Sequence, residues 1–259
     1  MAADQVEQSG LSKFLAQDRQ YVFPYHYIPH IETGYGVRFR ALHWGLEYLC
    51  YTGHARQVVR SLAPSSVLDV GCGDGRFLGT LDWGVERRKG VDLSERAIRF
   101  ARAFHEEIAF EAVDAGHLEG TFDVVTSVAV LEHVPQEHCR DFLASLEART
   151  RDGGHIVLVV PTHVIPLSSK HYRHYDLSLL EKQVDEGCRR SKVVGVEYVY
   201  RKSRLMECYL RLTHNRLWFI EFSFLNHLVW RHVWNRLRIA DEKTGQYIVA
   251  VLQKGVVGR

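Results

Sequence analysis

The chain lacks the features that mark secreted, disulfide-stabilised or membrane-spanning proteins. Its 259 residues include only five cysteines, an odd number without a Cys-x-x-Cys pair, so neither a disulfide framework nor a zinc knuckle is indicated. No run of about 20 apolar residues is present to span a bilayer, and the N-terminus lacks a basic segment followed by an apolar one. We therefore expect a cytoplasmic protein.

The chain also lacks a large excess of charge of one sign, with 33 Lys and Arg against 31 Asp and Glu. One region departs from this balance, because Arg189 to Arg238 contains eleven Lys and Arg and three Asp and Glu, a net charge of +8. Such an excess favours an anionic acceptor group, an anionic membrane surface or nucleic acid, and it equally fits a solvated basic face. The charge alone therefore identifies no partner.

What the chain does have is a regular alternation of strand and helix patterns. Helices are predicted at 74–81, 94–106 and 136–150. Strands are predicted at 66–70, 89–93, 108–113, 122–128 and 155–161. Apolar runs such as Ile156 to Val160 are typical of strands buried on both faces. The sequence therefore predicts an α/β fold with a doubly wound, Rossmann-like sheet.

Residues 1–60 precede this sheet and are predicted to be an N-terminal lid over the ligand cleft. Residues 21–30 are rich in aromatic residues and proline, and a helical pattern follows over 37–62 with a break near Gly53. An aromatic strap packed outside the sheet is the alternative. Residues 61–259 are then the main domain.

The segment from Val67 to Phe77 carries the main functional signal. It reads Val-Leu-Asp-Val-Gly-Cys-Gly-Asp-Gly-Arg-Phe, which is a strand, a glycine turn and a helix start, as in Rossmann-type nucleotide sites. The spacing Gly-x-Gly-x-Gly differs from the Gly-x-Gly-x-x-Gly expected for a dinucleotide. Asp69 adds a carboxylate that suits an ammonium group better than a phosphate. We therefore expect a cationic ligand at this turn.

This motif resembles the first motif of class I S-adenosylmethionine (SAM) dependent methyltransferases. Two more strand ends carry acidic residues, Asp92 before Leu93 and Asp114 before Ala115. The carboxylate of Asp92 can accept hydrogen bonds from both ribose hydroxyl groups. The resemblance implies that the carboxylate of Asp114 accepts a hydrogen bond from the adenine amino group. It assigns SAM as the cofactor, with these binding residues: Asp69, Gly71, Cys72, Gly73, Asp92, Leu93, Asp114, Ala115 and Ser127.

The resemblance covers about residues 60–161 and also implies how the sheet continues. It implies a seven-stranded sheet, mostly parallel with an antiparallel last strand. The last two strands are predicted at 193–200 and 245–253, and the basic, aromatic residues 203–240 would be an insertion between them.

The acceptor side is predicted from Leu131-Glu132-His133-Val134-Pro135. This run is similar to ubiquinone-biosynthesis O-methyltransferases and their small-molecule relatives. A neutral imidazole at His133 is suited to take a proton from a hydroxyl near pH 7, or it orders the loop. His171 and His174 follow the fifth strand, at the sheet edge that faces ligands in such folds, and are further catalytic candidates.

The same side chains have an alternative use as metal ligands. RNA 2′-O-methyltransferases of the small-RNA type bind a divalent cation through Glu-x-x-Glu-His and a later His. Glu132, His133, His171 and His174 fit part of this pattern, but the first acidic ligand falls at Ala129. The sequence therefore predicts no metal ion.

Taken together, these patterns predict a SAM-dependent methyltransferase that acts on a hydroxyl or amine. The expected acceptor is a small molecule, or a lipid- or sugar-linked one, and peripheral membrane contact is compatible with the basic region. Two alternatives stay open: an RNA 2′-O-methyltransferase, and a SAM- or NAD-binding protein that transfers no methyl group.

Overall fold

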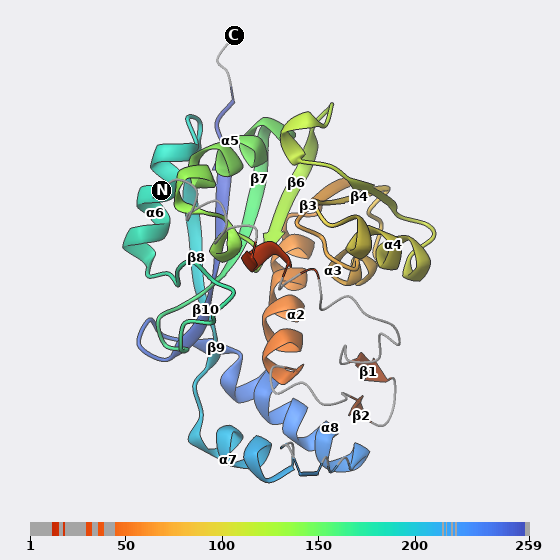
Figure 1. Cartoon of the computed structure of the whole chain (residues 1–259), viewed down its shortest axis with the longest axis vertical. Helices are drawn as coiled ribbons and strands as arrows, with labels where there is room; N and C mark the ends of the chain where they lie inside the picture. Colours follow the sequence, from red (N-terminus) through yellow and green to blue (C-terminus); the bar gives the residue numbers. More distant parts are fainter. Residues whose placement is uncertain are drawn as a thin grey trace.

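A computed structural model describes residues 12–15, 18, 30–32, 36–38, 45–213, 215, 217, 218, 220 and 222–256. Its centre is an eight-stranded sheet with the strand order β5-β4-β3-β6-β7-β10-β8-β9 (Figure 1). The strands of this sheet are β3 (Ser66–Val70), β4 (Arg87–Asp92), β5 (Ala109–Ala112), β6 (Phe122–Val128), β7 (Thr150–Pro161), β8 (Ser191–Arg201), β9 (Ile239–Ala240) and β10 (Gly245–Lys254). A separate two-stranded sheet pairs β1 (His30–Glu32) with β2 (Gly36–Arg38).

Strand direction confirms the predicted doubly wound sheet. Strands β5, β4, β3, β6 and β7 are parallel, and β10 is antiparallel to both β7 and β8. Strand β8 therefore runs in the same direction as β7. The carboxyl ends of β3, β4, β6 and β8 consequently lie at one edge of the sheet, which is where ligands bind in such folds.

The predicted count of seven strands is wrong by one. The two-residue strand β9 pairs with β8 through Tyr198 opposite Ala240 and Val199 opposite Ile239. This strand comes from the predicted insertion, which also contains α7 (Arg204–Thr213), α8 (Ser223–His232) and the π-helical turn η4 (Val233–Leu237). The eighth strand is therefore an edge addition to the predicted seven.

Helices cover both faces of the sheet, because successive strand residues point to opposite sides. On β3, Val67 belongs to one apolar cluster and Leu68 to the other. The first face is covered by α2 (Gly45–Ser61), α3 (Arg76–Gly79), α4 (Glu95–Phe104) and η4. The second face is covered by α5 (Cys139–Arg149), α6 (Leu177–Gly187) and the short turn η1 (Ala115–His117).

Helix α2 corrects the expected break near Gly53. The helix continues through this residue. A Cβ there would lie 3.1 Å from the indole ring of Trp234. Gly53 therefore allows η4 to approach α2 closely. The predicted lid over residues 1–60 stays a prediction, and the aromatic residues 21–29 lie outside the described residues.

Two helices differ from prediction in detail. Helix α3 begins at Arg76 and not at Asp74, because Gly75 precedes it with a left-handed φ of +76°. Ser94 caps α4 as predicted, accepting a hydrogen bond from the Ala97 amide, but Phe104 is 49% exposed and contributes little to the core.

No helix within the described ranges is long and apolar enough to cross a membrane.

Candidate functional site

The glycine turn after β3 is anchored to the end of β4. The amides of Gly71 and Cys72 both donate to the Val91 carbonyl, at 2.8 and 3.0 Å. The Gly73 amide donates to Oδ2 of Asp92 at 2.9 Å. The first and second motifs are thus one hydrogen-bonded unit at the carboxyl edge of the sheet.

The turn requires glycine because of its backbone angles and its neighbours. Gly71 and Gly73 have φ of +77° and +55°, a region that residues with a Cβ rarely adopt. A Cβ on Gly71 would lie 2.5 Å from a methyl group of Val130. The turn therefore packs directly against the residue that precedes the turn η2 (Leu131–His133).

Asp92 and Leu93 have opposite environments. The side chain of Asp92 is partly buried. Desolvation raises the pKa of its carboxyl group, while the amides of Ser94 and Gly73 counteract this by donating to it. The side chain of Leu93 is 64% exposed. An oriented carboxylate beside an exposed apolar side chain fits an adenosine, whose ribose needs hydrogen bonds and whose adenine needs an apolar surface.

Asp69 lies deeper, on β3, and is 2% exposed. The hydroxyl group of Thr126 on β6 donates to its Oδ1 at 2.6 Å. Burial raises the pKa of Asp69 to about 7 despite this hydrogen bond, and the nearby Asp92 carboxyl adds to the effect. A cationic group beside Asp69 would favour its ionised form.

The remaining predicted cofactor residues differ in their exposure to solvent. Asp114 is exposed, and its Oδ1 accepts a hydrogen bond from the Gly116 amide at 2.7 Å. Cys72, Ala115 and Ser127 are buried. The Ser127 hydroxyl has no hydrogen-bond partner among the described residues. Roles for these four residues in binding stay predictions.

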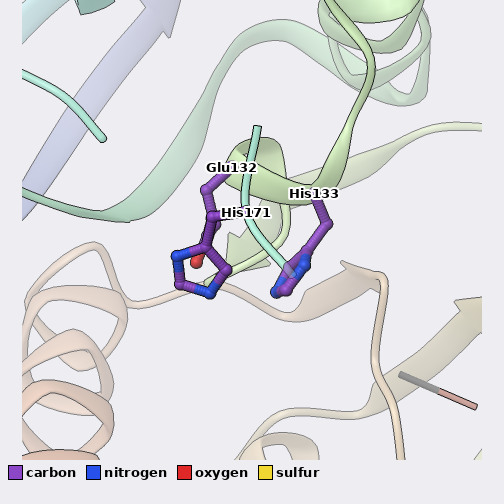
Figure 2. A group of neighbouring side chains, drawn as sticks. All are labelled: Glu132, His133 and His171. Atoms are coloured by element: carbon purple, nitrogen blue, oxygen red, sulfur yellow. The ribbon is translucent and has the colours of Figure 1, made fainter. Parts of the chain in front are cut away.

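The structure brings the three predicted acceptor-side histidines together. The rings of His133 and His171 lie 4.6 Å apart, and those of His171 and His174 lie 5.0 Å apart. Figure 2 shows His133 and His171 extending from different chain segments toward the same space, next to Glu132. The Tyr172 amide donates to the Glu132 carbonyl at 2.8 Å and holds the two segments together.

Backbone carbonyl groups determine which imidazole nitrogen carries the proton. A carbonyl only accepts, so Nδ1 of His133 donates to Lys170 at 3.2 Å, and Nδ1 of His174 donates to Ile165 at 3.1 Å. Nε2 of His174 then accepts from Nδ1 of His171 at 2.8 Å. In their neutral forms, His133 and His171 therefore both carry a lone pair on Nε2.

Burial keeps these imidazoles neutral. Together with the nearby Lys170 and Lys13, it lowers the pKa of His133 to about 4 and that of His171 to about 3. Burial raises the pKa of the Glu132 carboxyl to about 8. At pH 7 the group is thus a pair of neutral bases beside a protonated acid.

Glu132, His133 and His171 also offer ligand atoms within 4.8 Å of one another. Oε2 of Glu132 is buried and has no hydrogen-bond partner among the described residues. The side chain at Ala129 supplies no donor atom, so three potential ligands are present where the RNA enzymes use four. Loss of activity on treatment with a chelator would contradict the prediction of no metal ion.

Sequence reasoning missed two N-terminal residues that touch this site. Lys13 donates to the carbonyl groups of Ser169 and His171 at 3.0 and 3.2 Å. The Ser94 hydroxyl donates to Asp18. Lys13 thus contacts the histidine segment, and Asp18 contacts the residue next to the Asp92–Leu93 pair. No local pattern identifies Lys13 or Asp18, because each contact spans more than 70 residues of sequence.

Comparison with known proteins agrees with this geometry. A family model described as a methyltransferase domain matches residues 43–231. The ubiquinone biosynthesis O-methyltransferase of Ralstonia nicotianae is 36% identical over 109 residues, covering 39% of this chain and 44% of that protein. The protein of the same name from Thiobacillus denitrificans is 40% identical over 83 residues, covering 29% and 35%. The matched part thus spans less than half the length of these relatives.

Solved structures share the fold at low sequence identity. A SAM-dependent methyltransferase from Archaeoglobus fulgidus has a TM-score of 0.55 and 19% identity, covering 81% of this chain and 94% of the other. The magnesium protoporphyrin IX methyltransferase of Synechocystis has a TM-score of 0.55 and 14% identity, covering 84% and 86%.

The fold and the glycine turn are those of class I SAM-dependent methyltransferases, as predicted. The family match extends over most of the chain. The chain belongs to the methyltransferase-domain family, and the site formed by Asp69, Gly73, Asp92 and Leu93 fits SAM as its cofactor.

Replacing Asp92 by alanine is expected to weaken SAM binding by about 2–4 kcal/mol. Two charge-assisted hydrogen bonds to the ribose, each worth roughly 1.5–3 kcal/mol, would be lost, and water compensates in part. Calorimetric titration measures the change, with Asp141→Ala on the exposed surface of α5 as the matched control. Unchanged SAM affinity in a folded Asp92→Ala protein would show that Asp92 does not bind SAM.

SAM affinity is also expected to depend on pH through Asp69. Because burial raises its pKa to about 7, the free protein carries a protonated carboxyl group below that pH. Pairing with an ammonium group requires loss of this proton, so the Kd should fall about tenfold as pH rises from about 5.5 to about 7. Calorimetry in buffers of different ionisation enthalpy would detect the released proton.

The isosteric variant Asp69→Asn serves as the control for this titration. It keeps an oxygen for the Thr126 hydroxyl but cannot ionise, so its affinity for SAM should be lower and independent of pH over the same range. A wild-type Kd that stays constant across this range would contradict the contact between Asp69 and the ammonium group.

Proposed function

We propose that this protein transfers a methyl group from SAM to a hydroxyl group of a small-molecule or lipid-linked acceptor. The packing of Val130 against Gly71 carries this proposal. It brings the segment that leads into η2 against the turn that would hold the methyl donor, and His133 lies three residues further along this segment. A neutral base with a free Nε2 lone pair beside the donor is the arrangement that O-methylation needs.

The protein's own contribution is alignment and proton removal. When bound, SAM supplies a methyl group on a positively charged sulfur, which is already activated for attack. Asp92 and Leu93 would hold the adenosine, Asp69 the ammonium group, and the glycine turn would allow close approach. His133 would accept the proton of the acceptor hydroxyl, and the hydrogen bond to Lys170 would keep its ring oriented.

His171 and His174 support this role for His133. The chain of hydrogen bonds from Ile165 through His174 to His171 fixes the orientation of His171. The edge-to-face contact of His171 with His133 then restricts the rotation of the catalytic ring. We assign His133 as the base and the other two histidines as groups that bind the acceptor or orient His133.

The likeness to ubiquinone biosynthesis O-methyltransferases supports an oxygen acceptor. Residues Lys13 and Asp18 support the predicted N-terminal lid, because their segment contacts both the histidines and Ser94. The described cysteines are all free thiols, which agrees with the expected cytoplasmic location.

Incubation with methyl-labelled SAM and a panel of acceptors tests this function. The panel contains phenols with and without an apolar tail, the corresponding amines, and a single-stranded RNA. Labelled methyl ethers of the phenols are the expected products. Label on amines or RNA, with none on phenols, would overturn the assignment of the acceptor class.

A further inference from the structure

The segment from α7 to α8 exposes an unusual number of large apolar side chains. Nine of the seventeen large apolar side chains that are exposed among the described residues come from this one segment. They form what we call the α7–α8 surface: Leu205, Leu212, Leu217, Trp218, Ile220, Phe222, Phe224, Leu225 and Leu228. Their exposure ranges from 37% for Leu225 to 84% for Leu217. Exposed apolar groups of this density mark an interaction surface.

The two helices form a hairpin with internal support. The Tyr209 hydroxyl on α7 donates to Oδ1 of the buried Asn226 on α8 at 2.9 Å. In the connection, the Trp218 indole donates to the Leu212 carbonyl at 2.7 Å, and the Ile220 amide donates to the Thr213 carbonyl at 2.8 Å. The polar groups are thus satisfied inside the hairpin, while the leucine and phenylalanine side chains point to solvent.

Charge on this segment is almost entirely positive. Residues 203–240 contain six arginines, no lysine, two glutamates and no aspartate. Of these arginines, Arg204, Arg211 and Arg231 lie on α7 and α8 and are exposed. Exposed leucine and aromatic side chains combined with arginine are typical of segments that lie in the interface of an anionic membrane.

The surface lies at the functional end of the molecule. Strand β8 runs parallel to β7, and α7 begins three residues after β8 ends. Helices α7 and α8 therefore extend beyond the carboxyl edge of the sheet, as the lower part of Figure 1 shows. The glycine turn and the histidine segments follow the carboxyl ends of β3, β6 and β7 and so lie on the same side. A membrane bound here would face the edge of the sheet at which the proposed site lies.

We propose that the α7–α8 surface binds the interface of an anionic lipid bilayer. Its aliphatic side chains would enter the boundary between headgroups and acyl chains, and its arginines would pair with lipid phosphates. Nucleic acid is a poorer match, because six of the nine exposed side chains are aliphatic and offer it neither stacking nor charge. Binding to lipid is separate from methyl transfer and does not depend on the proposed acceptor.

Vesicle flotation tests this proposal with the full-length protein. The wild-type protein should float with phosphatidylcholine vesicles that contain phosphatidylglycerol, and should float weakly with phosphatidylcholine alone. High salt should release most of it, since exposed charges are screened beyond about 3 Å at 1 M salt. Binding should fall about fivefold for each arginine removed near the surface.

Two variants distinguish the apolar and basic contributions. Leu217→Glu with Phe224→Glu should abolish flotation, and Arg204→Glu, Arg211→Glu and Arg231→Glu together should lower it at least about a hundredfold. The matched controls are Val194→Glu with Val256→Glu, which are 57% and 74% exposed elsewhere, and the triple reversal of the exposed Arg99, Arg140 and Arg189. Both controls should float like the wild type.

SAM affinity and thermal unfolding, measured on every variant, confirm that each one is folded. Equal flotation of the surface variants and the wild type would overturn the proposal. So would a wild-type protein that stays free of anionic vesicles but self-associates through Leu217 and Phe224, or that binds single-stranded RNA through the three arginines. Loss of flotation with SAM affinity unchanged would support it, whatever acceptor is found.

Discussion

Replacement of Gly73 by valine is expected to abolish SAM binding while the protein stays folded. The φ of +55° at this position strains a β-branched residue by roughly 1–3 kcal/mol. The added methyl groups are also expected to occupy space that SAM needs, because the amide of this residue donates to Asp92 in the predicted cofactor site. We expect a loss of at least about 100-fold in affinity, or about 2.7 kcal/mol, by calorimetric titration.

Gly84 provides a matched control for the strain in this variant. It has a similar φ of +51°, and a Cβ there meets nothing within 4 Å. Gly84→Val should therefore lose comparable stability and keep full SAM affinity. If Gly73→Val loses its circular-dichroism signal while Gly84→Val does not, Gly73 is required for folding, and its role in the cofactor site is unsupported.

Replacement of His133 by alanine is expected to lower turnover about 10²–10⁴-fold, the usual contribution of a positioned base. SAM affinity should stay unchanged, because the loss falls on the chemical step. The matched control is His138→Ala, an exposed histidine on the short turn η3 (Gln136–His138). Steady-state assays with saturating SAM and acceptor measure both variants.

The pH profile gives a second test of the same base. An ordinary histidine would make the rate rise through a pKa of about 6.5, as the sequence alone suggests. Burial lowers the pKa of His133 to about 4, so this base is already unprotonated from about pH 5 upward. We therefore expect that titration of His133 causes no change in rate between about pH 6 and pH 8.

Two outcomes would contradict this role for His133. Full activity of His133→Ala would leave alignment as the source of catalysis. Loss of wild-type activity on treatment with a chelator, restored by added divalent cation, would instead make Glu132, His133 and His171 metal ligands. Turnover that is unaffected by the chelator is the result we expect.

The positions of the predicted cofactor residues in the fold could be inferred from the sequence, because these residues lie at the ends of predicted strands. Asp69, Gly71 and Asp92 belong to continuous strand and turn patterns, so their common edge follows from the parallel sheet. The hydrogen bond from Thr126 to Asp69 could not be predicted. Thr126 is 57 residues away, and no local pattern distinguishes it from other residues of a buried strand. Its effect on the carboxyl group depends on the register of β3 and β6.

The acceptor side was predicted in composition but not in arrangement. The gathering of His133, His171 and His174 follows from the sheet edge, yet the free Nε2 atoms depend on the carbonyl groups of Lys170 and Ile165. The position of a backbone carbonyl group cannot be predicted from the identities of the residues around it. Gly53 likewise suggested a helix break, because the sequence does not show that this position packs closely against Trp234.

Calorimetric titration of the purified wild-type protein tests the central claim most directly. SAM and its demethylated product should each bind once per chain, and NAD should give no heat of binding, because the turn has the spacing Gly-x-Gly-x-Gly. Binding of NAD with none of SAM would contradict membership of the site in the SAM-dependent class.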